Sequence, residues 1–390
     1  MIDSKLPENV LKIASNNMNN KVYTIISIAD IHFGCNENPQ YMYNQLREQF
    51  INRLTNLNYD ILAICGDLFD SRFMSNNPAI TYAVQFINDL VLECASRNAT
   101  LLIIAGTQSH DAGQLSLFYH YMNNPDIDVR IVERIQFEKI HGLRVLCIPE
   151  LYGIPEEEYI RVLYQSGRYD MCFLHGAYKG SFKGSEIATL NSNHAPVFGF
   201  NHFENCAGPI IMGHYHTPNV YDGYAYYNGS AFRYKFGEEE EKGFLITLYN
   251  PTTRRHYTEL IPIKSHTYST ININHLVNDD PKRIIDWIRN EKAVRGIDFI
   301  RVQFNSANEN MNIVRNYFRN TSTVRLQELD KKEKQLERID QEVLEKNKQY
   351  SYIIDPNIGD YDKFVMYINQ NEGFDYITTE ELINLLEGEI

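Results

Sequence analysis

The sequence predicts a layered α/β domain, and three observations carry that prediction. Six short apolar runs rich in isoleucine, leucine and valine are bounded by polar residues, as buried strands are. Segments with a helical spacing of apolar residues lie between the runs, including residues 41–57 and 78–97. Five of the six runs end directly on a carboxylate, a glycine-polar cluster or a histidine. The runs are Val22–Ala29, Ile61–Cys65, Leu101–Ala105, Val145–Ile148, Met171–Leu174 and Pro209–Met212.

Composition limits the class of protein. The chain has 390 residues, enough for two or three domains with buried cores. Hydrophobic residues make up 43% and charged residues 22%, so a chain disordered as a whole is excluded. The six cysteines form no C-x-x-C pair, and we expect buried free thiols in a reducing compartment. No apolar run approaches the roughly 18 residues of a membrane helix, so we expect no membrane contact and a cytoplasmic location, in a bacterial cell or an infected host cell.

The net charge of the chain restricts how it can bind nucleic acid. A net charge of −13 argues against binding DNA by bulk electrostatics alone. Any contact with nucleic acid must therefore be local, metal-assisted or shared with a partner. The sequence also lacks the Walker A pattern G-x-x-x-x-G-K-[ST], so ATP hydrolysis in the same assembly would come from another chain.

The pattern divides the chain into five segments. The main domain spans residues 21–263, and residues 1–20 before it are expected to be flexible. Residues 264–325 alternate between strand-like and helix-like patterns, which predicts a small α/β module. Residues 326–356 are charged and helix-favouring, which predicts a solvated helical linker. Residues 357–390 carry two short amphipathic stretches, and a helical hairpin with more apolar surface than it can bury alone is typical of a docking element.

Carboxylates and imidazoles follow the predicted strands. In open α/β sheets the carboxyl ends of the strands form the ligand crevice, so these side chains are expected to converge. Mixed oxygen and nitrogen donors without cysteine suit manganese, iron or zinc. D-x-H and H-x-H pairs each direct two donors to the same side of an extended segment, and two such pairs with a shared aspartate can hold two ions. The candidates are Asp30, His32, Asp67, Asp70, His110, Asp111, His175, His214 and His216.

Taken in order, these motifs resemble the calcineurin-like metallophosphoesterase superfamily, whose pattern is D-x-H, G-D-x-x-D, G-N-H-D, H-G and G-H-x-H. The resemblance covers about residues 22–262. Within the superfamily the chain is similar to the SbcD-type nuclease subunit of the double-strand-break repair complex, through GDLFD, GHYHTP and the segment at 227–244. The resemblance implies a four-layer sandwich of two mixed β-sheets flanked by helices, with a small α/β capping domain and a C-terminal helical extension.

The resemblance also implies a role for each motif residue. Two divalent ions, with manganese expected, are held by aspartates and histidines, and a further histidine acts in catalysis. The aspartate after that histidine either orients its ring or caps a helix. The corresponding residues are Asp30, His32 and His216 for one ion, Asp67 as the bridge, His175 and His214 for the second ion, and His110 with Asp111 as the catalytic pair.

One loop departs from the family pattern. The family has G-N-H-D, whose asparagine supplies an amide oxygen to the second ion, whereas this chain carries two more residues between Gly106 and His110 and has no asparagine there. Alignment back from His110 puts Ser109 in the asparagine position, while chemistry favours the carboxamide oxygen of Gln108. The sequence leaves these two alternatives open.

Three further residues are candidates for contact with substrate. Asp70 stands where related enzymes vary between histidine and aspartate, and it either supports the site, caps a helix or faces DNA. Arg233 contacts a backbone phosphate or makes a structural ion pair. Lys179 lies in a glycine-containing loop after His175 and is a candidate phosphate contact.

The resemblance implies a metal-dependent DNA exonuclease and endonuclease that acts in DNA repair, recombination or replication. It further implies a coiled-coil ABC-type ATPase bound through the C-terminal helices, and a homodimer. Two alternatives stay open: a phosphomonoesterase or protein phosphatase that uses the same ions, and a catalytically weakened scaffold for the ATPase.

Overall fold

The computed structural model describes residues 21–35, 38–111, 113–154, 156–165, 167–179, 197–305 and 307–329. The described chain divides into two compact units. One takes in the described residues up to Thr270 together with Glu291–Ile300, and the other contains Ile271–Asn290 and the described residues from Arg301 onward. The segment expected to be flexible, most of the expected linker and the expected hairpin lie outside the described residues.

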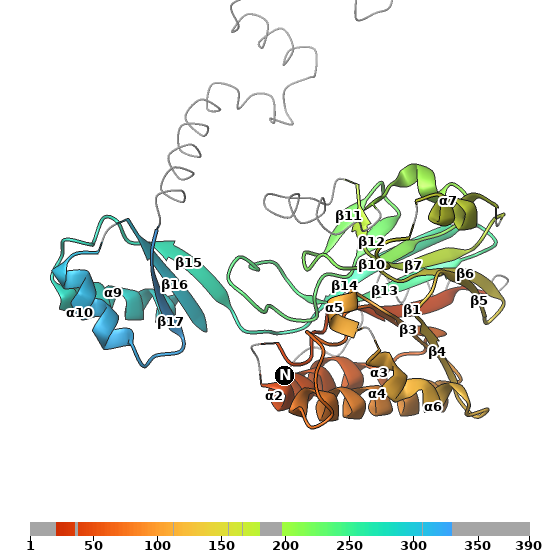
Figure 1. Ribbon diagram of the computed structural model, residues 1–390, viewed down its shortest axis with the longest axis horizontal. Helices are drawn as coiled ribbons and strands as arrows, with labels where there is room; N and C mark the ends of the chain where they lie inside the picture. Colours follow the sequence, from red (N-terminus) through yellow and green to blue (C-terminus); the bar gives the residue numbers. More distant parts are fainter. Residues whose placement is uncertain are drawn as a thin grey trace, which may run out of the picture. The chain divides into compact units, whose positions relative to one another are not determined.

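Two six-stranded sheets form the main unit (Figure 1). In the first sheet, in the order β14-β13-β1-β2-β3-β4, the last four strands are parallel and the first two pair antiparallel. Its strands are β1 (Tyr23–Ile28), β2 (Ile61–Cys65), β3 (Thr100–Ile104), β4 (Asp128–Val132), β13 (Gly243–Asn250) and β14 (Arg255–Pro262).

The second sheet has the order β11-β12-β10-β7-β6-β5, with parallel pairing from β12 to β6 and an antiparallel strand at each edge. A separate pair, β8 (Ala177–Tyr178) and β9 (Val197–Phe198), is also parallel. The six strands are β5 (Gln136–Ile140), β6 (Leu143–Ile148), β7 (Met171–His175), β10 (Ile210–Gly213), β11 (Asn219–Tyr221) and β12 (Ala225–Tyr227).

Three apolar clusters stack these elements into four layers. One cluster lies between the sheets, where Ile25 and Ala63 of the first sheet meet Phe173 of the second. A second joins the outer face of the first sheet to its helices, and a third joins the outer face of the second sheet to its own. The order helix, sheet, sheet, helix is the four-layer mixed α/β sandwich that the sequence predicts (Figure 1). The covering elements are α2 (Pro39–Leu46), η1 (Arg47–Ile51), α3 (Asn52–Leu54), α4 (Pro78–Arg97), η2 (Leu115–Phe118) and α6 (Tyr119–Met122) on the first sheet, and α7 (Glu156–Gln165) and η3 (Phe200–Phe203) on the second.

Helix α4 shows how local sequence sets an element. The side chain of Asn77 accepts the backbone amide of Ala79 at 2.8 Å, Pro78 occupies the first helical position, and Asn98 ends the helix in the left-handed conformation. Its apolar face, which includes Phe86, packs on the first sheet. The observed bounds are those that the apolar spacing predicts.

The chain beyond β14 forms the three-stranded sheet β15-β16-β17 with two helices. The order strand, helix, strand, helix, strand is the one that the sequence predicts. The last strand ends just beyond the boundary expected at residue 325. Within the described residues no helix is long and apolar enough to cross a membrane. The elements are β15 (Tyr268–Asn272), α9 (Pro281–Val294), β16 (Phe299–Phe304), α10 (Glu309–Phe318) and β17 (Val324–Glu328).

The two large sheets approach each other closely where β10 ends. A Cβ built on Gly213 would lie 2.1 Å from the carbonyl oxygen of Cys65 at the end of β2, and 2.9 Å from Nδ1 of His175. Only glycine fits between these two strand ends without a shift of backbone. The close approach brings the residues that follow β2, β7 and β10 within reach of one another.

We expect Gly213→Ala to lower the free energy of unfolding by about 1–3 kcal/mol, because the added methyl group overlaps a backbone oxygen that cannot move freely. Urea unfolding of the wild type and the variant measures the difference. If the two proteins had the same urea midpoint and the same m-value, the two sheets would be able to move apart at this edge without a loss of stability.

Candidate metal centre

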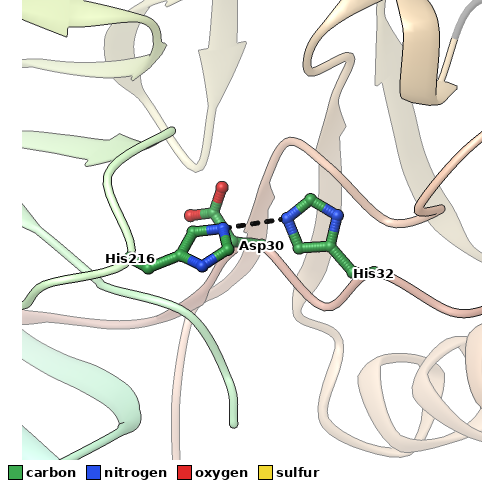
Figure 2. Close-up of side chains that lie close together, drawn as sticks. All are labelled: Asp30, His32 and His216. Atoms are coloured by element: carbon green, nitrogen blue, oxygen red, sulfur yellow. Dashed lines mark hydrogen bonds between the residues drawn. The ribbon is translucent and has the colours of Figure 1, made fainter. Parts of the chain in front are cut away.

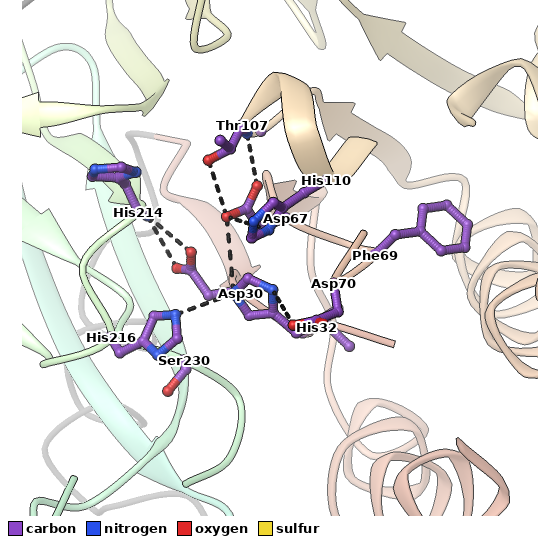
Figure 3. Close-up of polar contacts among 12 residues, drawn as sticks. Asp30, His32, Asp67, Phe69, Asp70, Thr107, His110, His214, His216 and Ser230 are labelled. Atoms are coloured by element: carbon purple, nitrogen blue, oxygen red, sulfur yellow. Dashed lines mark hydrogen bonds and ion pairs between the residues drawn. The ribbon is translucent and has the colours of Figure 1, made fainter. Parts of the chain in front are cut away.

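Loops at the carboxyl ends of six strands gather the candidate side chains. Figure 3 shows how Asp30, His32, Asp67, His110, His214 and His216 lie among them. Their donor atoms form four overlapping groups, and within each group the atoms lie within 4.8 Å of one another. Asp30 and His32 follow β1, Asp67 follows β2, His110 lies in the short helix α5 (Gln108–Asp111) after β3, Glu150 follows β6, His175 ends β7, and His214 and His216 follow β10.

Asp30, His32 and His216 form the first group (Figure 2). The Nε2 atoms of the two imidazoles face each other at 3.1 Å. Both oxygens of Asp30 lie 3.1 Å from the backbone amide of His214, which holds the carboxylate toward the imidazoles. Burial lowers the pKa of His32 to about 3, so its ring is neutral at pH 7 and offers a lone pair. The group therefore presents a carboxylate and two imidazoles toward a single point.

Asp67 lies between the other members of the site. Its Oδ2 atom is 3.8 Å from Nε2 of His32, 3.3 Å from Nδ1 of His110 and 3.4 Å from Nε2 of His175. Burial by itself raises the pKa of this carboxyl, but the charge and hydrogen bonds of the neighbouring imidazoles outweigh burial and hold the pKa well below its usual range. Asp67 is thus ionised and can serve two neighbouring ions.

Glu150, His175 and His214 form another group. Nδ1–H of His175 donates to the carbonyl oxygen of Cys65 at 2.7 Å, which leaves Nε2 to face the other candidate ligands. That Nε2 atom is buried and has no hydrogen-bond partner in the described part of the chain. Glu150 is buried, and its Oε2 lies 3.2 Å from Nδ1 of His214.

The backbone of the site is strained at its donors. Eight non-glycine residues among those described have a positive φ, and four of them are Asp30, His32, Asp67 and His214, with φ of 49°, 52°, 52° and 109°. This region is unfavourable for residues with a Cβ and persists only where the surroundings impose it. Backbone strain concentrated on four candidate ligands marks this cluster as a functional site.

The donor set fits divalent ions. Buried carboxylates and imidazoles converge without cysteine, a combination that suits manganese, iron or zinc. The unpartnered Nε2 of His175 supports the fit, since a buried ring nitrogen without a hydrogen bond is rare unless an ion occupies its lone pair. Buried histidine and aspartate clusters in this structure can therefore hold metal ions.

A carboxylate outside the donor groups orients His216. Nδ1 of His216 lies 2.8 Å from Oε1 of Glu238, a buried residue whose Oε2 accepts the backbone amide of Tyr234. Nζ of the buried Lys242 donates to the backbone carbonyl of His216 at 2.6 Å. Because Nδ1–H donates to Glu238, Nε2 is the nitrogen left to face His32.

We expect Glu238→Gln to weaken manganese binding by roughly 10-fold, because a neutral amide oxygen replaces the charged acceptor that orients His216. Isothermal titration calorimetry measures the change. The exposed neighbour Glu241, changed to glutamine, is the matched control and should bind as the wild type does. Equal affinities in both variants would show that Glu238 does not act through His216.

The altered loop places Thr107, not Gln108 or Ser109, beside the carboxylates. The backbone amide of Thr107 donates to Oδ1 of Asp67 at 2.7 Å, and its hydroxyl lies 3.0 Å from Oε2 of Glu150. Gln108 and Ser109 are exposed in the first turn of α5. The two additional residues are taken up by this helical turn, so the residue directly after Gly106 is the one that reaches the site.

Asp111 has a structural role in the loops, and the catalytic role expected for it stays a prediction. Its carboxylate is buried, and its oxygens accept the backbone amides of Phe69 at 3.1 Å and Gly106 at 2.9 Å. Burial, with the nearby charge of Asp67, raises the pKa of Asp111 to about 6. Asp111 ties the loops after β2 and β3 together.

The three residues expected to contact substrate lie in different surroundings. Oδ1 of the partly exposed Asp70 is 3.6 Å from Nδ1 of His32, so this residue borders the site (Figure 3). The guanidinium of Arg233 donates to the backbone carbonyls of residues 239 and 240, at 2.9 and 3.0 Å, and its contact with a backbone phosphate stays a prediction. Lys179 is exposed at the end of β8, and the loop that follows lies outside the described residues.

Sequence patterns did not single out Glu150, Thr107 or Glu238. Glu150 follows the one apolar run that does not end directly on a polar residue, because Pro149 intervenes. Thr107 stands directly after Gly106, where the family asparagine stands. Glu238 opens the acidic stretch at 238–241, where the sequence does not distinguish the buried glutamate from its exposed neighbours.

Comparison with known proteins finds one similar curated protein, a phosphoesterase by name. No family model matches the chain. The chain is 22% identical over 279 residues to the protein named "Putative phosphoesterase 244L" of Invertebrate iridescent virus 6, which covers 69% of this chain and 91% of that protein. A solved structure aligns with a TM-score of 0.38 and 12% identity over 62% of this chain and 99% of the other. The similarity to 244L and the clustered carboxylates and imidazoles together fit a phosphoesterase-type, metal-dependent hydrolase.

Proposed function

We propose that this chain is a DNA phosphodiesterase, with exonuclease and endonuclease activity, that uses two divalent ions, with manganese as the preferred metal. The observation that carries the proposal is a buried aspartate, Asp67, between two sets of donors. Asp30, His32 and His216 would hold one ion, and His175 and His214 would hold the other. Two ions bound to one carboxylate are the arrangement that in-line phosphoryl displacement uses.

The residues of the chain divide the work of hydrolysis. When bound, the ions would supply an activated water and offset the charge of the phosphate. Asp67 fixes the spacing of the two sets of donors, while the neutral His32 and its partner His216 direct lone pairs inward. His110 lies at the edge of the site with about a quarter of its side chain exposed, where it can contact a phosphate.

His110 is suited to protonate the leaving oxygen. Burial lowers the pKa of its ring, but the hydrogen bond and charge of Asp67 outweigh burial and raise it. A histidine that holds its proton more firmly at neutral pH can donate that proton as the bond to the leaving group breaks.

Two parts of the proposal rest on the sequence: that the substrate is DNA and that the partner is an ATPase. The motif order, GDLFD and the glycine-serine-arginine segment are similar to the SbcD-type nuclease. With a net charge of −13, the chain is suited to bind DNA together with a partner. Because the sequence has no Walker A pattern, a coiled-coil ABC-type ATPase would supply ATP hydrolysis. We place that partner at the C-terminal segment 357–390 and propose a homodimer, with a role in DNA repair, recombination or replication.

The test is manganese-dependent cleavage of end-labelled linear and hairpin DNA, beside a phosphomonoester, by the full chain with and without a chelator. Cleavage of DNA only in the presence of metal is the expected result. Cleavage of the monoester alone would replace the proposal with a phosphomonoesterase or protein phosphatase. No cleavage of either substrate, with the partner ATPase also present, would favour the catalytically weakened scaffold.

A further inference from the structure

Glu150 lies in the candidate metal centre, although none of the motifs in the resemblance contains it. Its side chain is 3% exposed. Its Oε2 atom is 3.2 Å from Nδ1 of His214 and 3.6 Å from Nε2 of His175, while Oε1 accepts the hydroxyl of Tyr152 at 2.8 Å. A carboxylate buried this deeply needs a positive partner, because an isolated buried charge is costly.

The ring of His175 lies against the oxygens of Glu150 and Asp67. Its Nδ1–H donates to Cys65, and Nε2 faces the oxygens of Glu150 at 3.6 Å and Asp67 at 3.4 Å without a hydrogen bond to either. An ion bound between Nε2 and the two carboxylates would use the nitrogen lone pair and offset both negative charges. Atoms bound about 2.0–2.2 Å from one ion lie roughly 3.0–3.6 Å apart, which is the spacing seen here.

Thr107 holds Glu150 and Asp67 together. Its hydroxyl is within hydrogen-bond distance of both, at 3.0 Å from Oε2 of Glu150 and 3.3 Å from Oδ2 of Asp67. Its backbone amide also donates to Asp67. Thr107 therefore positions two carboxylates and brings no amide oxygen of its own.

We propose that Glu150 is the ligand that completes the second ion site, in place of the neutral asparagine of the resembling family. The proposal rests on the proposed function in one respect, that the chain binds two divalent ions. Glu150 gives the centre three carboxylates, with Asp30 and Asp67, and one more negative charge than a site with asparagine. The second ion is therefore held more tightly than a neutral ligand would hold it, and it stays bound at lower free manganese.

Manganese titration of the full chain tests the proposal with a readout independent of activity. Calorimetry gives the number of ions and their affinities, and electron paramagnetic resonance detects the coupling between two neighbouring manganese ions. We expect two coupled ions in the wild type. Glu150→Ala should bind one ion and lose the coupled signal, whereas Glu150→Gln, which keeps an oxygen donor, should bind the second ion about tenfold or more weakly.

Glu259→Gln is the matched control. Glu259, in β14, accepts the hydroxyl of Tyr257 at 2.9 Å, as Glu150 accepts that of Tyr152, but it belongs to none of the donor groups. This variant should bind both ions as the wild type does. Circular dichroism confirms folding, and the glutamine variant decides the question if the alanine variant does not fold.

Two results would overturn the proposal. They differ in whether the proposed two-ion function is rejected as well. Wild-type affinity for both ions in Glu150→Ala and Glu150→Gln would reject Glu150 as a ligand and leave the two-ion function intact. A wild type that binds no manganese would reject the proposed function together with the role of Glu150.

Discussion

Replacing His110 with alanine should lower kcat for DNA cleavage by about 100-fold or more, while both ions stay bound. The imidazole lies 3.3 Å from Asp67 and is partly exposed, so it can reach a phosphate at the edge of the site. Loss of a general acid slows the step in which the leaving oxygen takes up a proton. Single-turnover cleavage of labelled DNA at saturating manganese measures the rate, and calorimetry measures the ion count.

His120→Ala is the control for this variant. His120 lies in α6, where it is exposed and its ring is tilted against that of Tyr121, and it belongs to none of the donor groups. The His120→Ala variant should cleave DNA at the wild-type rate. An ion count of one in the His110 variant would contradict the catalytic assignment, because His110 would then be a ligand, together with His32 and Asp67.

Asp67→Asn should reduce cleavage by about 1000-fold or more and abolish binding of at least one ion, because it removes the charge that both sets of donors share. The substitution is mild for the backbone. Asp67 has a φ of 52°, a conformation that asparagine also adopts readily, and the amide oxygen can still accept the backbone amide of Thr107. Calorimetry with manganese separates lost binding from slowed chemistry.

Asp126→Asn, at an exposed turn, is the control for the loss of one carboxylate and should leave ion count and rate unchanged. The folded state of Asp67→Asn without metal should be less stable than the wild type at pH 7, because the lowered pKa of Asp67 means that its charge is favourable in the folded chain. Full binding of two ions by this variant would mean that Asp67 is not the bridge.

The strands and helices with strong periodicity were predictable, and those at the edges were not. The apolar runs of β1, β2 and β3 are buried on both faces, so their sequences read as continuous apolar runs. Edge strand β5 has the sequence QFEKI and is mostly half-buried, which leaves no such run. The helix expected from residue 41 begins earlier, at Pro39, because the side chain of Asn38 accepts the amides of residues 40 and 41.

The candidate site was predictable where a motif places two donors on one short segment. D-x-H and H-x-H each put two donors on one short segment, and the structure brings both pairs into one centre. The extended conformation expected for these segments was wrong, because Asp30, His32 and His214 have a positive φ. Glu150 was not predictable, because its role depends on which strands lie side by side: β6 pairs with β7, and that pairing puts Glu150 next to His175. No spacing within a single segment encodes that contact.

The loops that carry Asp30 and Asp67 are joined beyond the ends of their strands. The amide of Asp30 donates to the carbonyl of Gly66, and the amides of Ile31 and His32 both donate to the carbonyl of Asp67. These bonds extend the β1–β2 pairing into the site, so their amide hydrogens should exchange with deuterium as slowly as those of the core, with or without metal. The donors are then ordered when the chain folds, and ion loading is limited by encounter and dehydration of the ion, not by rearrangement of the protein.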